Sequence, residues 1–281
     1  MKAIVSLRFS IMLLAVLLAS CQTIDLNQIT SVTASLGDAV SLKGEEEEQE
    51  VGAQAANVLL GAAEVVEDED LQRYVNRVGH WVALHSDRPE LPWTFAVLND
   101  GDINAFAAPG GYVFITAGLL ARMRSEAELA GVLGHEIGHV TEKHHLKAIR
   151  KEARLKIAGV LAAAALESEG HDSDRYVALA DGAKTIYTRG LDRGDEYEAD
   201  RIGVVLAARA GYDPYGLPAV LQTLDSLNAD SSALALMTAT HPAPQSRLEK
   251  LDKAMSAQTG QFAGGKSGSK RFRAEMTRLT R

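Results

Sequence analysis

The chain has 281 residues and a net charge of −8; 46% of its residues are hydrophobic and only 5% are aromatic. This length allows one large domain or two small ones, and a core built mainly from Ala, Leu and Val favours packed helices over a β-sandwich. The acidic balance argues against a nucleic-acid partner. The single cysteine excludes an intrachain disulfide framework, a multi-cysteine zinc finger and an iron–sulfur site.

The N-terminal segment has the features of an export signal. Lys2 and Arg8 precede an apolar run at 11–19, which is shorter than the ~20 residues that a membrane-spanning helix needs. The run ends in Leu18-Ala19-Ser20-Cys21, which resembles the bacterial lipobox, where the cysteine is lipidated and becomes the first residue of the mature chain. We therefore expect a signal peptide at 1–20 and a lipid anchor at Cys21. The alternative is an ordinary cleaved signal with an incidental cysteine.

The residues after the cysteine bear on location. By resemblance to Gram-negative lipoproteins, Gln22 in place of Asp favours the outer membrane over the inner one. Several acyl chains on one cysteine anchor a protein firmly. We expect a protein of the bacterial envelope that faces the periplasm, with residues 21–44 forming the lipidated N-terminus and a polar tether.

The rest of the chain is predicted to be α+β and mostly helical. Helices are expected at 45–61, 68–85, from 125 onward through the central motif, and at 153–166, 175–188, 195–211, 214–228 and 243–256. Short apolar runs at 93–98, 103–107 and 112–116 predict a small antiparallel sheet. We expect one domain over 45–257, followed by a basic, flexible tail over 258–281.

The central motif is His135-Glu136-Ile137-Gly138-His139. The H-E-x-x-H spacing places both imidazoles on one helix face, where both can reach one Zn²⁺, and Glu136 can take a proton from bound water. The alternative is a pair of surface histidines on an ordinary helix. The apolar residues around the motif argue against that alternative, because they predict a largely buried helix.

Two histidines do not complete a catalytic zinc site, which normally has three protein ligands and one open position. The segment 195–200, with the sequence D-E-Y-E-A-D, offers Glu196 and Asp200 four residues apart on one helix face. One carboxylate can bind the metal while the other accepts the spare N–H of a zinc-bound histidine. The alternative is a solvated acidic helix start.

Four further segments accompany these motifs. They are N-A-F-A-A-P-G-G at 104–111, T-R-G-L-D-R at 188–193, A-G-Y-D-P at 210–214, and T-H-P at 240–242 followed by Arg247. The combination, spread over most of residues 45–255, resembles the CAAX-prenyl-protease-like and HtpX-like zinc metallopeptidases, and most closely their soluble periplasmic lipoprotein branch. The chain ends soon after Arg247, so we expect no C-terminal helical-repeat domain of the kind some members carry.

The resemblance implies a zincin-like (gluzincin) metallopeptidase domain with one Zn²⁺ per chain. It implies that His135, His139 and Glu196 bind the metal, that Glu136 is the general base, and that Asp200 is the outer carboxylate. In this mechanism Glu136 removes the proton of the zinc-activated water and returns it to the leaving amine.

The resemblance also draws attention to His241 and Arg247. The tetrahedral oxyanion of peptide hydrolysis needs further donors, and either residue is a candidate for that catalytic role. His241 has two alternatives: it occupies the open zinc position and holds the enzyme latent, or it is simply the residue before Pro242 at a helix start.

The strand that begins at Tyr112 is a candidate for binding substrate by edge-strand pairing, with Gly110 and Gly111 allowing close backbone approach. The alternative is a plain hairpin turn. His144 and His145 lie five and six residues beyond His139 and, on a continuous helix, rotate away from the zinc face. We interpret these two histidines as structural or surface groups.

Together these features predict a lipid-anchored zinc endopeptidase of envelope protein quality control, whose substrates are misfolded or misassembled envelope polypeptides. One alternative is a chaperone-like or assembly-assisting lipoprotein with a latent or structural zinc site. Another is a zinc hydrolase of a different substrate, such as peptidoglycan peptides. Glu136 favours a hydrolase over a structural site, because a structural zinc site needs no base.

Overall fold

The computed structural model describes residues 44–164, 181, 184–227, 232–256 and 264–277. The predicted signal peptide, Cys21 and the polar tether lie outside these residues. In the described part of the chain, no helix combines the length and apolar character that crossing a bilayer requires.

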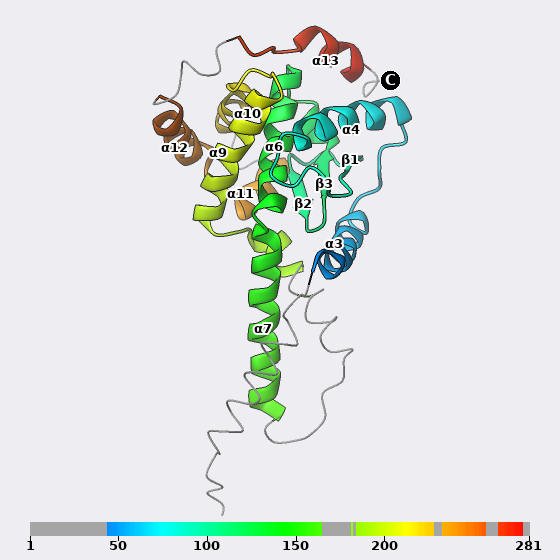
Figure 1. Cartoon of the computed structure of the whole chain (residues 1–281), viewed down its shortest axis with the longest axis vertical. Coiled ribbons are helices and arrows are strands. Elements are labelled where there is room, and N and C mark those ends of the chain that lie inside the picture. The colour runs from blue at the N-terminus through cyan, green and yellow to red at the C-terminus, as the bar shows by residue number, and fades with distance from the viewer. Residues whose placement is uncertain (1–43, 165–180, 182–183, 228–231, 257–263, 278–281) are drawn as a thin grey trace, which may run out of the picture. The chain divides into compact units, whose positions relative to one another are not determined.

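The described residues confirm a mostly helical chain with a small sheet (Figure 1). The helices are α3 (Glu45–Leu60), α4 (Glu69–Ala83), α5 (Ala117–Leu120), α6 (Glu126–Thr141), α7 (His144–Ala164), α9 (Arg193–Arg209), α10 (Gly216–Asp225), α11 (Ala235–Thr240), α12 (Pro244–Ser256) and α13 (Ser269–Met276), with a short 3₁₀ turn at Ser232–Leu234. The strands are β1 (Thr94–Leu98), β2 (Ala105–Ala108) and β3 (Tyr112–Thr116).

The sheet is mixed, which corrects the predicted antiparallel arrangement. Its strand order is β1-β3-β2: β3 pairs parallel with β1 and antiparallel with β2. The chain crosses from β1 to the far side of β3 before β2, and then returns through the tight turn at Gly110 and Gly111, whose φ angles are 80° and 104°. Because β3 is paired on both sides, the strand of Tyr112 cannot bind a substrate by edge pairing. Among the described strands, β2 is the edge strand on that side.

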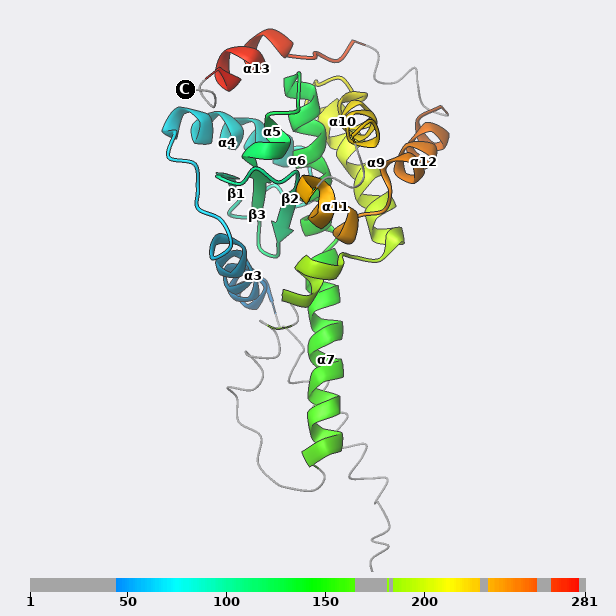
Figure 2. The same ribbon diagram turned by 180° about the vertical axis from the view of Figure 1, so that it is seen from behind.

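Helix α6 runs through the middle of the domain, as the two opposite views show (Figures 1 and 2). It packs against α9, α10, α4 and the sheet, and every residue from Glu126 to Val140 is buried. Ser125 caps its first turn by accepting a hydrogen bond from the Glu128 N–H at 3.2 Å. A helix buried on all sides must satisfy its polar residues within the protein, and these include the three polar residues of the H-E-x-x-H motif.

A close helix crossing positions this motif. A Cβ atom added to Gly203 of α9 would lie 2.7 Å from the backbone nitrogen of His135, and one added to Gly134 of α6 would lie 2.9 Å from the Gly203 carbonyl oxygen. Only glycine allows the two backbones to approach this closely. The acidic start of α9 is thereby brought against the histidine face of α6.

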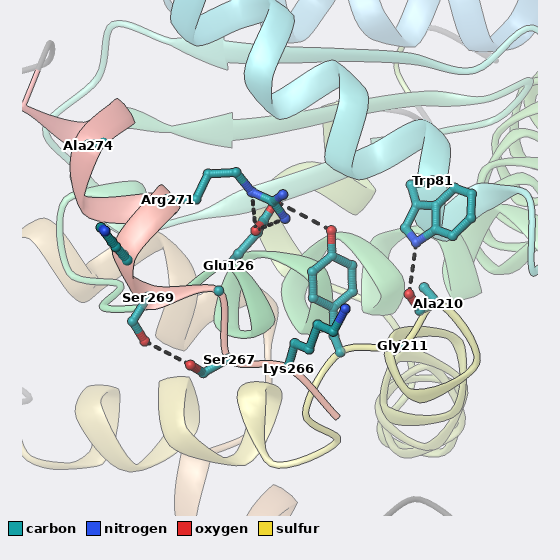
Figure 3. Close-up of a pocket in the computed structure, with 12 residues that line it drawn as sticks. Trp81, Glu126, Ala210, Gly211, Lys266, Ser267, Ser269, Arg271 and Ala274 are labelled. Carbon is teal, nitrogen blue, oxygen red and sulfur yellow. Dashed lines mark hydrogen bonds and ion pairs between the residues drawn. The ribbon is translucent and has the colours of Figure 1, made fainter. Parts of the chain in front are cut away.

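The C-terminal segment corrects the predicted loose tail. Residues 264–277 contain α13, which packs on α4 and α6, and Phe272 is buried in the core. Arg271 forms an ion pair with the buried Glu126 at the start of α6 (Figure 3). The Ser267 carbonyl accepts a hydrogen bond from Ala127 N–H at 3.0 Å. Composition suggested a mobile tail, but the buried Phe272 ring, the ion pair and backbone hydrogen bonds dock the segment.

Candidate metal centre

Two histidines of α6 face each other at the centre of the domain. The Nε2 atoms of His135 and His139 are 3.1 Å apart, and both side chains are almost fully buried. The separation of four residues places them one helical turn apart on the same face. Two ring nitrogens at this distance, one turn apart, are arranged to bind a single cation.

Helix α9 supplies a carboxylate to the same point. Glu196 places Oε1 3.4 Å from His139 Nε2 and Oε2 3.8 Å from His135 Nε2. The residue is 1% exposed, and its Oε2 accepts no hydrogen bond from the described residues. An orphaned buried carboxylate oxygen is costly, and a bound cation would satisfy it.

The donor set therefore fits Zn²⁺. Two imidazole nitrogens and one carboxylate oxygen lie within 4.8 Å of one another and are all buried. Three such ligands leave one position open, as in catalytic rather than structural zinc sites. His135, His139 and Glu196, the three residues expected from the motifs, are thus brought together by the fold.

Electrostatics support the same assignment. Burial, assisted by Arg247 for His135 and by neighbouring histidines for His139, holds the pKa of both imidazoles below the usual range. They are therefore neutral at pH 7, the state that binds metals. Burial raises the pKa of Glu196 to about 8, although Arg247 opposes the shift. A divalent cation among these groups would offset the cost of an ionised carboxylate.

A buried ion pair supports His135 from outside. Asp200 Oδ1 lies 3.0 Å from His135 Nδ1, and Arg247 donates to the same carboxylate from Nε and from a terminal nitrogen at 2.9 and 2.6 Å. Although burial alone would raise it, the guanidinium holds the pKa of Asp200 well below its usual range. Arg247 is 3% exposed and bound to Asp200, so it stabilises the carboxylate beside His135. It also lines one of the small cavities that Glu136 lines, and its role as an oxyanion donor stays a prediction.

Glu136 lies beside the three metal-binding candidates and is itself buried. Burial, only partly offset by the Arg247 charge, raises its pKa to about 8. The residue lines two small cavities of about 20 Å³ each, together with Ala105 of β2 and His241. Each cavity has room for about one water molecule. A carboxyl whose pKa is near neutrality beside a water-sized space is suited to proton transfer.

His241 also lies next to the cluster. It follows α11, and its Nε2 is 3.7 Å from Glu196 Oε2. One ring nitrogen, one Glu136 oxygen and one nitrogen of His135 lie within 4.8 Å of one another. Burial and the Arg247 charge hold the pKa of His241 well below its usual range, so a neutral imidazole lies at the edge of the site.

Sequence reasoning missed one buried neighbour of the cluster. His144 is 1% exposed, and its Nδ1 lies 3.1 Å from Nδ1 of His139. The expected rotation away from the zinc face does not occur, because α6 ends at Thr141 and Lys143 has φ 59°. The helical phase restarts at α7. No sequence signal marks this break, since residues other than Gly, Asn and Asp rarely adopt positive φ.

The predicted substrate residues lie elsewhere. Gly110, Gly111 and Tyr112 form the turn and start of the central strand, and none of them lines the cavities beside Glu136. Ala105 and Phe106 of the edge strand β2 line those cavities instead. The outer edge of β2 is partly covered, because the Tyr187 hydroxyl donates to the Ala107 carbonyl at 2.7 Å.

A larger cleft lies at the other end of α6. It has a volume of about 860 Å³ and is lined by Trp81, Glu126 and the C-terminal segment (Figure 3). Glu126 is nine residues before His135, a rise of about 13 Å along the helix. This cleft contains none of the metal-binding candidates.

The chain matches the model of peptidase family M48 over residues 69–255. It is 34% identical over 192 residues to the putative beta-barrel assembly-enhancing protease of Vibrio cholerae, covering 66% of this chain and 39% of that protein. The corresponding protein of Escherichia coli is 32% identical over 208 residues, covering 72% and 42%. The mitochondrial metalloendopeptidase OMA1 of Schizosaccharomyces pombe is 31% identical over 180 residues, covering 64% and 52%. The chain thus spans less than half the length of these bacterial relatives.

Proposed function

Because this chain belongs to peptidase family M48, whose members are zinc-dependent and have a zincin-like fold, we propose that it is a zinc metalloendopeptidase. The observation that carries the proposal is the meeting of His135, His139 and Glu196 from two helices, with Glu136 beside them. A structural zinc site would need neither the open fourth position nor an adjacent carboxyl that titrates near neutral pH.

The chain's own residues supply the rest of the chemistry. A zinc ion at this site would polarise the scissile carbonyl and lower the pKa of a water molecule toward ~7. Glu136 accepts the proton of the attacking water and returns it to the leaving amine. Asp200, held by Arg247, fixes the Nδ1–H tautomer of His135 so that Nε2 stays available to the metal.

Substrate entry requires movement of the covering segments. The cavities beside Glu136 hold about one water molecule each, which is far too little for a peptide. The helical segment 184–189 contributes Tyr187, whose hydroxyl occupies a backbone acceptor on β2. We propose that a polypeptide pairs with β2 in place of this contact, which replaces the proposal based on Tyr112.

His241 has two candidate roles that predict opposite effects. As a switch it occupies the position where Glu136 must activate water, and His241→Ala raises casein cleavage or self-cleavage. As an oxyanion donor it is required, and His241→Ala lowers the rate by ~10²–10³-fold. Both roles leave zinc content near normal, because three other ligands remain. An unchanged rate assigns His241 a structural role only.

The decisive experiment compares Glu136→Gln with Glu142→Gln, a control at the end of the same helix that does not line the cavities beside Glu136. Glu136→Gln keeps a similar shape but cannot accept the proton. We expect it to retain about one zinc per chain and to lose casein cleavage by 10²-fold or more, about 3 kcal/mol. Near-normal turnover with zinc bound would overturn the assignment of the base. Retained zinc in wild type with no cleavage of any polypeptide would favour the chaperone-like alternative.

We further propose that the protein is lipid-anchored at Cys21 in the bacterial envelope and acts on misassembled envelope polypeptides. The lipobox supports the anchor, and the names of the bacterial relatives, beta-barrel assembly-enhancing proteases, are consistent with such substrates. Cys21→Ser should abolish fatty-acid labelling and either stall processing or release a soluble form. Wild-type protein that carries no fatty acid and fractionates as soluble would refute the anchor.

A further inference from the structure

His144 is a buried polar residue that the proposed mechanism does not use. Its Nδ1 faces Nδ1 of His139 at 3.1 Å, and its Nε2 faces Glu198 Oε2 at 3.3 Å and Asp195 Oδ1 at 3.7 Å. The two carboxylates belong to the first turns of α9 and are partly exposed, while His144 is 1% exposed. A continuous row of polar groups therefore runs from the metal-binding face to the surface.

The position of the single hydrogen on each neutral imidazole determines which group in this row donates and which accepts. A neutral imidazole carries one N–H, so when His139 presents the lone pair of Nε2 toward His135 and Glu196, its hydrogen lies on Nδ1. That N–H must donate to His144 Nδ1, which is its neighbour at hydrogen-bond distance. His144 Nδ1 then accepts, so the hydrogen of His144 lies on Nε2 and points at Glu198 and Asp195. Every group in the row has a partner of the opposite kind.

The same count argues against a second metal site. One ligand atom each from His144, Asp195 and Glu198 lies within 4.8 Å of the others, a spacing that would hold a cation. Metal binding there requires the lone pair of His144 Nε2, and the hydrogen would then move to Nδ1. Two N–H groups would face each other at 3.1 Å, which is repulsive. The two sites therefore require opposite tautomers of His144.

We propose that His144 is a positioning residue for His139. Its Nδ1 accepts the Nδ1–H of that ligand, and its own Nε2–H points at the carboxylates of Glu198 and Asp195. This inference rests on the proposed metal site. His135 has an equivalent support in Asp200, so each imidazole ligand has an outer partner backed by carboxylate. Such partners fix ring orientation and raise ligand basicity, and their loss weakens metal binding by roughly 10–100-fold.

The backbone is built to place this imidazole. Lys143 lies between α6 and α7 with φ 59°, and its ammonium pairs with Glu48 Oε2 of α3 at 2.9 Å. Without this left-handed residue α6 would continue and His144 would point elsewhere. The ion pair with the buried carboxylate of Glu48 holds this left-handed, non-glycine residue in the conformation that directs His144 toward His139.

The test measures zinc affinity by competition with a chromophoric chelator, and the visible spectrum of the Co²⁺-substituted protein. His144→Ala should weaken zinc binding 10–100-fold and alter the cobalt spectrum. His144→Asn should restore most of the affinity, because its Oδ1 lies at the position of Nδ1 and can accept the same N–H. The matched control is His145→Ala: His145 is half-buried, and its ring centroid lies 5.2 Å from that of His139, as does the centroid of His144. Its Nδ1, however, makes no hydrogen bond among the described residues. We expect it to stay within threefold of wild type.

Four outcomes would overturn the proposal, the last of them in a fallback variant. One is wild-type affinity and spectrum in His144→Ala, and another is an equal loss in His145→Ala, which would indicate packing alone. The third is a second zinc equivalent in wild type that His144→Ala removes. If His144→Ala does not fold, the double variant Asp195→Ala/Glu198→Ala tests the same row of polar groups and should also weaken zinc binding. An unchanged zinc affinity in that variant overturns the proposal as well. Peptidase activity is scored separately, so a wild type that binds zinc and cleaves nothing refutes the proposed function alone.

Discussion

The buried ion pairs of Glu48 allow a quantitative test of how much they contribute to the stability of the domain. This carboxylate of α3 is 2% exposed; it accepts from Arg88 at 2.7 and 3.1 Å and pairs with Lys143 at 2.9 Å. In Glu48→Gln the volume is kept but the charge is lost, and two cations face a neutral amide. Breaking a fully buried ion pair costs about 3–5 kcal/mol.

The partial exposure of the two cations determines how much unfolding free energy Glu48→Gln is expected to lose. The side chains of Arg88 and Lys143 are 14% and 40% exposed, so water replaces part of the lost interaction. We expect Glu48→Gln to lower the free energy of unfolding by about 2–4 kcal/mol. For a domain of this size, that corresponds to a Tm lowered by about 4–16 °C. Glu45→Gln is the control: Glu45 pairs with the same arginine at 3.3 Å but is 69% exposed, and should cost no more than about 0.5 kcal/mol.

The effect has a defined pH dependence. Burial raises the pKa of Glu48, but the hydrogen bonds and charges of Arg88 and Lys143 outweigh it, so the net shift is downward. A lowered folded-state pKa means that the stabilisation is complete above the unfolded value of ~4.3 and is lost as the pH falls through the folded value. The stability difference between wild type and Glu48→Gln should therefore be full at pH 7 and shrink below about pH 4.

The assay is urea unfolding of the metal-free protein, followed by circular dichroism. Urea is preferred over guanidinium chloride because the salt would screen the ion pair. A Glu48→Gln variant within 0.5 kcal/mol of wild type at pH 7, or equal losses in the two glutamine variants, would refute the argument that burial makes this ion pair strong.

Three further predictions concern packing and metal. Phe272→Ala removes a side chain that is 1% exposed; it should cost about 3–5 kcal/mol in urea unfolding and increase amide hydrogen exchange in α13, and unchanged exchange would contradict the docking of that helix. Gly203→Ala places a methyl group against the His135 backbone; it should cost about 1–3 kcal/mol and weaken zinc binding in chelator competition, whereas wild-type affinity would show that the crossing can relax. Removing the metal with a chelator should lower Tm, because zinc at 1,000 times its Kd would stabilise the native state by about 4 kcal/mol. Scanning calorimetry with and without zinc measures this difference, and equal Tm values would mean that the site does not bind zinc.

The sequence alone was sufficient for the parts of this protein that depend on local spacing. The H-E-x-x-H motif lies on one helix face whatever surrounds it, so His135, Glu136 and His139 could be placed together in advance. The mostly helical character followed from composition and periodicity. Family motifs also singled out Glu196 and Asp200, although their contact with α6 depends on a crossing that no local pattern encodes.

Only the tertiary structure decided the features that depend on long-range packing. Strand order is one, because pairing partners are chosen across the sheet, and this moved the candidate substrate edge from β3 to β2. The docking of α13 through Phe272 is another, since one buried ring outweighed a polar composition. The position of His144 is the third. A single left-handed residue, Lys143, ends the helical phase of α6, and His144, which was predicted to face away, points instead toward His139, the proposed metal ligand.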